Sequence, residues 1–341
     1  MASTREVALS MLHYLQRISS RTWVRLGFLG FFLYSCWQLW RFYQWAVGTG
    51  SYVDRPEATA GLVPLGALMS LAAWLKSGVF DPVMPASVVI ILAALLLSVL
   101  FKRGFCGWVC PVGTVASALG WAGRLMSGGR PRRMPVWLDR TLRVPKYLMA
   151  AYLVGWMAMM PASIGLDFQL LPYYATSDMK ILYGLLHPAW GYWALAGFVV
   201  VTSLGSGTNT WCRYLCPLGA IYGGASAASL GVVRRDPRAC IDCKACDAAC
   251  SARIEVSTST RAIRSPECDG CMDCTRDCPV PGALTSRLAG LTVPWQFWPA
   301  FIVVTWLLVW AFATATGHWQ QGIPDELVAE YMRTMKLTHD F

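Results

Sequence analysis

Eight of the 13 cysteines form two runs with one shared spacing, CxxCxxCxxxC. The first run, CIDCKACDAAC, contains Cys240, Cys243, Cys246 and Cys250, and the second, CDGCMDCTRDC, contains Cys268, Cys271, Cys274 and Cys278. In this spacing three cysteines wrap one iron–sulfur cubane and the fourth turns away to ligate the other cluster. The spacing therefore predicts two 4Fe-4S clusters. We expect the ligands of the first to be Cys240, Cys243, Cys246 and Cys278, and those of the second Cys268, Cys271, Cys274 and Cys250.

A pair of zinc sites is the alternative for these cysteines. Structural zinc sites use CxxC pairs separated by a longer spacer, so the tight runs favour iron–sulfur chemistry. One departure from the usual form is that Ser251 follows Cys250, whereas Pro279 follows Cys278. We expect the missing proline to loosen the first turn without removing a ligand.

Four more cysteines lie in two matched motifs, FCGWVCPVG and WCRYLCPLG, offset by 106 residues. They are Cys106, Cys110, Cys212 and Cys216. Matched motifs at the same ends of two helices indicate an internal parallel repeat, which would bring the four thiols together. We expect a shared metal or redox site at the cytoplasmic membrane boundary, with a redox-active dithiol or simple packing as the alternatives. Cys36 stands alone and is predicted to pack in the core.

The composition is that of a membrane protein, with 55% hydrophobic and 14% charged residues. Five apolar stretches come near the length that a bilayer core requires, over residues 22–47, 84–101, 147–164, 189–204 and 295–314. Of the 29 Lys and Arg residues, 23 fall within 1–26, 102–146 and 208–292. Because basic segments stay on the cytoplasmic side, the N-terminus and the cysteine runs are predicted inside and the C-terminus outside. Reduced cytoplasmic thiols also argue against disulfides.

The predicted fold is mainly α: an integral membrane helical bundle of about five spans, with a small α+β two-cluster ferredoxin-like domain inserted before the last span. The expected domains are a cytoplasmic segment (1–21), a four-span membrane domain with both CxxxCP motifs (22–231), a cytoplasmic ferredoxin domain (232–290), a fifth span (291–314) and a periplasmic tail (315–341). The tail has the pattern of a short amphipathic helix, which would dock a partner or lie on the bilayer.

The four histidines bear on haem and quinone binding. None of His13, His187, His318 and His339 lies central in a span, which argues against a transmembrane haem. His187 and His318 share the outer interface with Asp81, Asp167 and Asp178, where a quinol needs proton acceptors. Ordinary interfacial residues are the alternative. The apolar stretch 60–80 is expected either to wall a quinone pocket or to cap the bundle.

Together, the spans, both CxxxCP motifs and the paired ferredoxin runs resemble the NapH family of membrane-bound ferredoxin-type proteins over residues 20–320. The resemblance extends to YccM and to the membrane and ferredoxin portion of NosR-type regulators, and a MauN-type protein is an alternative. It implies a protein of the bacterial inner membrane that passes electrons from the quinol pool to a periplasmic reductase, through partner iron–sulfur or haem proteins.

The leading hypothesis is an electron-transfer subunit rather than a stand-alone enzyme, because the sequence shows no nucleophile–base set and no phosphate loop. A cytoplasmic electron donor is an alternative to quinol. The second hypothesis is an assembly, maturation or redox-regulatory factor for a periplasmic or membrane metalloenzyme. Nucleic-acid binding is excluded because the basic residues flank membrane spans. A transporter is disfavoured because no charged residue lies deep in a span.

Overall fold

The computed structural model describes residues 20–126, 135–260 and 262–337. Most of the expected cytoplasmic segment 1–21, including His13, lies outside the described residues, as does His339. Within the described part, helices form most of the structure, and a small three-stranded sheet and the connecting loops form the rest.

The helical part precedes the ferredoxin-like part along the chain. Its elements are α2 (Ser20–Ala46), η1 (Glu57–Leu62), α3 (Pro64–Ser77), α4 (Pro85–Phe101), η2 (Phe105–Val109), α5 (Pro111–Met126), α6 (Val136–Met159), α7 (Ala162–Gln169), α8 (Pro172–Ala175), α9 (Ser177–Leu186), α10 (Trp190–Ser206), η3 (Trp211–Leu215) and α11 (Pro217–Ala227). The second part comprises β1 (Gly231–Arg235), α12 (Ala245–Ala249), α13 (Asp273–Arg276), β2 (Leu284–Leu288) and β3 (Leu291–Thr292). The chain then continues through η4 (Trp295–Phe297), α14 (Trp298–Ala315) and α15 (Asp325–Leu337).

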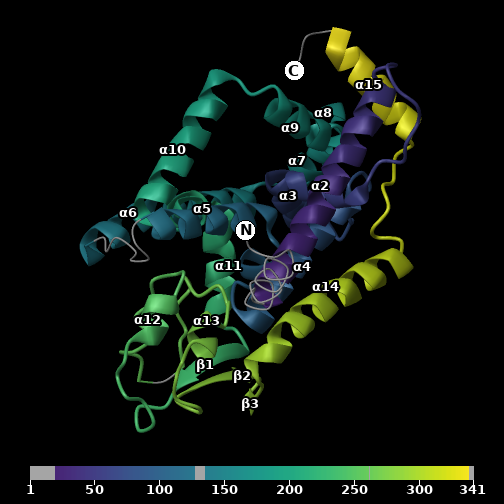
Figure 1. The fold of residues 1–341 in the computed structure, drawn as a ribbon. Coiled ribbons are helices and arrows are strands. Elements are labelled where there is room, and N and C mark those ends of the chain that lie inside the picture. The colour runs from purple at the N-terminus through teal and green to yellow at the C-terminus, as the bar shows by residue number, and fades with distance from the viewer. Residues whose placement is uncertain (1–19, 127–134, 261, 338–341) are drawn as a thin grey trace, which may run out of the picture.

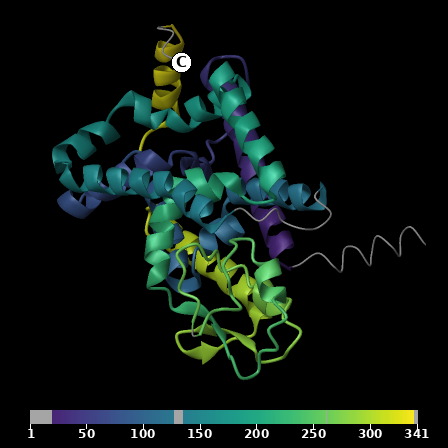
Figure 2. The same cartoon turned by 90° about the vertical axis from the view of Figure 1, so that its left-hand side faces the viewer.

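The ferredoxin-like part and α15 lie at opposite ends of the molecule (Figures 1 and 2). Helix α4 runs through the middle of the structure and buries most of its side chains. Helix α10 stands at the side, packed mainly on α5, and leaves large apolar side chains exposed, such as Trp190 at 84%. A soluble protein rarely exposes so much contiguous apolar surface, so this arrangement is typical of a lipid-facing helix.

The five expected spans differ in how well they match helices. In the described part of the chain, one helix, Trp295–Ala315, is long and apolar enough to cross a membrane alone. Helix α2 has 27 residues but is less apolar, and α4 is apolar but has only 17 residues. The span count from the sequence is therefore not established by the helices themselves.

The sequence predicts a third span over residues 147–164. This prediction is wrong in one respect, because the segment is not a single continuous helix. Helices α6 and α7 meet at an angle of 101°. Met160, which ends α6, has the extended conformation (φ −62°, ψ 128°), because the ring of Pro161 disfavours a helical residue before it. The expected fourth span corresponds to α10, which makes an angle of 75° with α9 before it. If each bent pair is counted as one span, the described residues contain three candidate membrane spans.

The internal repeat is visible in the local backbone. Both CxxxCP motifs form five-residue π-helical turns, η2 and η3, whose bounds differ by 106 residues. Cys110 and Cys216 end these turns in extended conformations, and their amide N–H groups donate to the carbonyls of Phe105 and Trp211. Because proline follows each cysteine, the π turn stops there and a new helix begins.

The small sheet is antiparallel in the order β1-β2-β3, with Gly231 opposite Leu288. Its inner side chains share one core with the helical part. This core contains Leu97, Phe101 and Trp108 from the α4–η2 region, Val233 and Leu284 from the sheet, and Trp298 and Ile302 from α14. The ferredoxin-like part is therefore packed on the helices rather than tethered by a flexible linker.

The C-terminal helix packs on α2 at the far end of the molecule. Val328, Ala329 and Met332 are buried together with Leu39 and Phe42 of α2. The predicted amphipathic helix is present as α15, and α2 covers part of the apolar face that the sequence assigned to a partner or to lipid. Nearby, Arg55 forms a buried ion pair with Asp178, 2.6 Å between Nη2 and Oδ1.

Glu57 is expected to make stability depend on pH. Burial raises the pKa of Glu57 to about 7, and the charges of Asp325 and Asp178 add to the rise. The backbone amide of Gln321, which donates to the carboxylate at 2.9 Å, and the charge of Arg55 lower the pKa but do not outweigh burial. Between pH 4.5 and 7 the folded state therefore binds more protons than the unfolded state, so stability falls as pH rises through this range. Thermal midpoints in detergent at pH 5 and pH 8 measure the effect. Glu57→Gln should flatten the dependence, and an unchanged pH slope would contradict the assignment.

Candidate metal centres

The two cysteine runs fold into loops with matching backbones. The residue before the second cysteine and the residue after it both have positive φ in each loop. These are Asp242 (52°) and Lys244 (58°) in the first loop, and Gly270 and Met272 (62° each) in the second. Non-glycine residues rarely adopt this conformation, so its occurrence at matched positions reflects the tight wrapping that the CxxCxxC spacing requires. Short helices α12 and α13 then begin just before the third cysteine of each loop.

The second expected ligand set is gathered in one place. Burial raises the pKa of the Cys274 thiol, and the neighbouring Cys268 and Cys250 add to the rise. Cys250 in turn interacts with Cys268, and Cys271 interacts with Cys274. The structure therefore places Cys250, from the first run, among the three leading cysteines of the second run. The assignment of these four thiols to one cluster stays a prediction.

The first expected ligand set is more open. Cys246 is buried, and burial raises the pKa of its thiol. Cys278, from the second run, adds to this rise. Cys243 is exposed, and Cys240 is half-buried beside Arg235. The neighbouring Ile241 is 66% exposed. This loop faces solvent.

Within the described residues, no three His, Cys, Asp or Glu side chains gather closely enough to hold one metal ion. In a cubane each cysteine binds a different iron atom, so the sulfurs surround the cluster instead of converging on one point. Ser251, which stands where proline is usual, donates from its hydroxyl to Asp269 at 3.2 Å. This bond ties the first run to the second loop.

The second loop is docked directly on the first CxxxCP motif. The backbone amide of Arg103 donates to the carbonyl of Cys268 at 3.3 Å, and the indole N–H of Trp108 donates to the carbonyl of Gly270 at 3.0 Å. A Cβ on Gly107 would lie 2.3 Å from the carbonyl oxygen of Asp269. Arg21 closes the contact with ion pairs to Asp269 and Asp273 at 3.0 and 2.7 Å.

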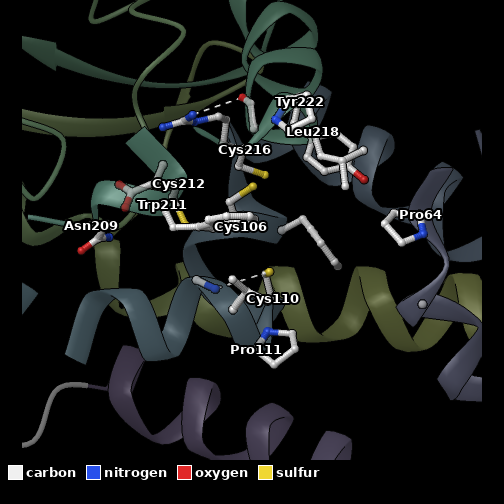
Figure 3. A pocket seen from close by; sticks show the side chains of 18 of the residues that line it. Pro64, Cys106, Cys110, Pro111, Asn209, Trp211, Cys212, Cys216, Leu218 and Tyr222 are labelled. Carbon is white, nitrogen blue, oxygen red and sulfur yellow. Dashed lines mark hydrogen bonds between the residues drawn. The ribbon is translucent and has the colours of Figure 1, made fainter. Parts of the chain in front are cut away.

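The four CxxxCP cysteines line one cavity of about 380 Å³ (Figure 3). Burial raises the pKa of the Cys106 thiol, and Cys110, Cys216 and Cys212 each add to the rise. Figure 3 shows cysteines of both motifs near one another, with Pro64 of α3 across the cavity. The cavity continues toward an apolar wall made of Ala60, Leu62, Pro64, Leu65, Ile90 and Ile91. The structure thus brings together the four thiols that the sequence placed in two distant motifs.

A buried ion network beside the second loop was not found from the sequence. Glu267, next to Cys268, accepts hydrogen bonds from Lys146 Nζ at 2.8 and 2.9 Å and from the Tyr147 hydroxyl at 2.5 Å. Arg103 lies 3.5 Å away, and the side chain of Lys146 is 0% exposed. Burial opposes ionisation of Glu267, but Arg103 and Lys146 outweigh it and hold its pKa at about 2. A carboxylate directly before a cluster cysteine is the only sequence signal for this network.

The two outer histidines and the two buried aspartates each make contacts within the fold. Asp81 is buried and accepts from the Tyr174 hydroxyl at 2.5 Å and from two backbone amides. Asp178 is paired with Arg55. His187 stacks on Tyr183, and His318 packs edge-on against Phe80. The two buried aspartates are committed to internal bonds, which favours ordinary interfacial residues over a proton-accepting site at this face.

Two matched cysteine loops docked on a helical part with a four-cysteine cavity define an iron–sulfur protein of the ferredoxin type. Comparisons with known proteins agree. A 4Fe-4S binding domain matches twice, over residues 83–133 and 186–235, and a 4Fe-4S dicluster domain matches residues 232–279. No solved structure matches the chain.

Several curated proteins are similar over long stretches. The putative electron transport protein YccM of Escherichia coli is 35% identical over 85% of this chain and 82% of its own length. The ferredoxin-type protein NapH of Haemophilus influenzae is 26% identical, over 61% of this chain and 59% of NapH. The methylamine utilization ferredoxin-type protein MauN of Methylorubrum extorquens is 29% identical, over 49% of this chain and 55% of MauN. The chain belongs to the family of ferredoxin-type 4Fe-4S electron-transfer proteins that includes YccM and NapH.

Proposed function

We propose that the chain passes electrons between the quinol pool, or a cytoplasmic donor, and a periplasmic respiratory reductase system, working with other electron-transfer subunits. The observation that carries the proposal is the direct contact between the second cysteine loop and the first CxxxCP turn. Through this contact, the ligand loops of a ferredoxin-like domain lie against a four-thiol cavity. Short contacts between redox sites are what single-electron transfer within a protein requires.

We further propose that the chain crosses the bacterial inner membrane about five times, with the cysteine loops cytoplasmic and the tail periplasmic. The distribution of Lys and Arg supports this orientation. The position of α15 at the end opposite the ferredoxin-like part supports it too (Figure 1). In this proposal, the bends of 101° after α6 and of 75° before α10 would lie inside the third and fourth crossings or at their edges.

The two expected ligand sets would hold two 4Fe-4S clusters. The first set is Cys240, Cys243, Cys246 and Cys278, and the second is Cys268, Cys271, Cys274 and Cys250. A further iron–sulfur centre would be held by the four CxxxCP cysteines, Cys106, Cys110, Cys212 and Cys216. Such centres supply one-electron redox chemistry when bound. The apolar wall of the cavity suits the ring and tail of a quinone, which would reach the thiols without crossing water.

Iron and acid-labile sulfide per chain test the proposal, in protein prepared without oxygen. We expect about twelve iron atoms in the wild type and about eight in Cys106→Ala and Cys212→Ala, because each cubane contains four. Cys36→Ala, which changes a cysteine outside all three sets, is the matched control and should keep the wild-type value. About eight iron atoms in the wild type would remove the third centre.

A quinol assay separates electron transfer from the maturation hypothesis. A reduced quinone analogue should reduce the iron–sulfur centres of the purified protein within seconds. If the cluster spectrum does not change with quinol or with a chemical donor of lower potential, the chain does not conduct electrons and the assembly or regulatory role stands instead.

A further inference from the structure

The four-cysteine cavity contains more positive than negative charge. Its charged lining consists of Arg25, Arg103, Arg213, Glu267 and Asp269. Three of these five have an ion-pair partner outside the cavity lining: Arg213 with Asp139, Glu267 with Lys146, and Asp269 with Arg21. When these partners are counted, a net positive charge remains, carried by Arg25 from α2 and by Arg103 from the turn that precedes η2. Arg103 shares Glu267 with Lys146, at 3.5 Å from the carboxylate.

Arg103 is fixed at the junction of both motifs and the second cysteine loop. One terminal nitrogen donates to the carbonyl of Gly219 at 3.1 Å, and the other donates to the carbonyl of Glu267 at 2.8 Å. The residue is 7% exposed, and within the described part of the chain its Nε–H is buried without an acceptor. A buried donor of this kind is destabilising when it is left unsatisfied. Its position on the lining, beside Cys106 and Cys212, indicates an acceptor inside the cavity.

Arg25 repeats the pattern on another wall. Its Nη2 donates to the Ser117 hydroxyl at 3.0 Å, and its Nε–H is also buried without an acceptor in the described residues. The second half of the repeat has no arginine that matches Arg103, because the residue in register with Arg103 is Asn209. Asn209 lines the same cavity and donates its side-chain amide to Ser117 at 2.9 Å. The positive charge is therefore asymmetric.

We infer that Arg103, together with Arg25, is a positioning residue for the negatively charged, thiolate-ligated iron–sulfur centre proposed for this cavity. Four thiolates give such a centre a net negative charge, and cations and N–H donors near the sulfurs stabilise its reduced form. Both side chains thereby raise the midpoint potential of the centre. The inference rests on the proposed function, since it requires that the four cysteines hold iron.

The test is a redox titration followed by electron paramagnetic resonance, monitoring the signal that is lost in Cys106→Ala. We expect Arg25→Gln to lower the midpoint potential of this signal while the iron content stays at the wild-type value. Arg103→Gln should lower it further, and Arg103→Lys, which keeps the charge, should restore most of the shift. Arg124→Gln is the matched control, because Arg124 lies on α5, donates to the Gly207 carbonyl and does not line the cavity.

The outcomes separate this inference from the proposed function. A wild type with about eight iron atoms and no signal that depends on Cys106 would overturn both. About twelve iron atoms, with the potential unchanged in both Arg25→Gln and Arg103→Gln, would overturn the inference alone. If Arg103→Gln fails to assemble the centre, Arg25→Gln decides, since the guanidinium of Arg25 donates to Ser117 of α5, whereas that of Arg103 donates to the carbonyl of Glu267 beside the second cysteine loop.

Discussion

Replacing Gly107 with alanine is expected to loosen the ferredoxin-like part from the helices. The new Cβ would lie 2.3 Å from the Asp269 carbonyl oxygen, which belongs to the backbone and is held by the loop around it. Relief requires η2 and the second cysteine loop to separate, and overpacking of this kind costs about 1–3 kcal/mol. We expect a lower thermal midpoint and faster limited proteolysis of the ferredoxin-like part in Gly107→Ala.

Gly224→Ala is the matched control for this prediction. Gly224 lies on α11, and a Cβ there meets no atom within 4 Å. Alanine at such a helical site is expected to stabilise the protein by about 0.4–1 kcal/mol. If Gly107→Ala melts and is cleaved like Gly224→Ala, the close contact between the two parts does not hold the molecule together.

Replacing Glu267 with glutamine is expected to destabilise the protein by about 3–5 kcal/mol, because it leaves the buried charge of Lys146 without its carboxylate. The neutral amide still accepts one hydrogen bond but no longer compensates the ammonium. Since Cys268 is the next residue, we also expect Glu267→Gln to lose iron from the second ligand set. Thermal unfolding and iron content measure the two effects.

Two comparisons sharpen this prediction. Lys146→Met should cost less than Glu267→Gln, because Glu267 keeps Arg103 and the Tyr147 hydroxyl as partners. Glu255→Gln, at an exposed glutamate of the same domain, should leave both the midpoint and the iron content unchanged. Equal losses in Lys146→Met and Glu267→Gln would show that the pair, rather than an uncompensated ammonium, sets the cost.

Local spacing was enough to predict much of this molecule. The CxxCxxCxxxC runs predicted loops of ferredoxin type, and the 106-residue offset placed Cys106 and Cys110 beside Cys212 and Cys216. These predictions succeed because each motif encodes its own backbone geometry within about ten residues. The last apolar stretch likewise became α14, because apolar length alone decides whether a helix can span a bilayer.

Contacts between distant residues were not predictable in the same way. Lys146 reads as one of many membrane-flanking cations, and its partner Glu267 lies 121 residues away. Gly107 carries no signal for its contact with Asp269, because only the docked fold makes that position crowded. Pro161 is a local signal for a break in the helix, but the prediction over 147–164 used only the number of apolar residues. Hydropathy sums the transfer energy of side chains and contains nothing about the backbone conformation before proline.

The matched π turns also carry an evolutionary consequence. A chain of half this length, with a single CxxxCP turn, would build the same four-thiol chamber by pairing with an identical copy about a twofold axis. Gene duplication and fusion would release the halves from that symmetry. One half could then evolve an arginine at position 103 while the other kept an amide at Asn209.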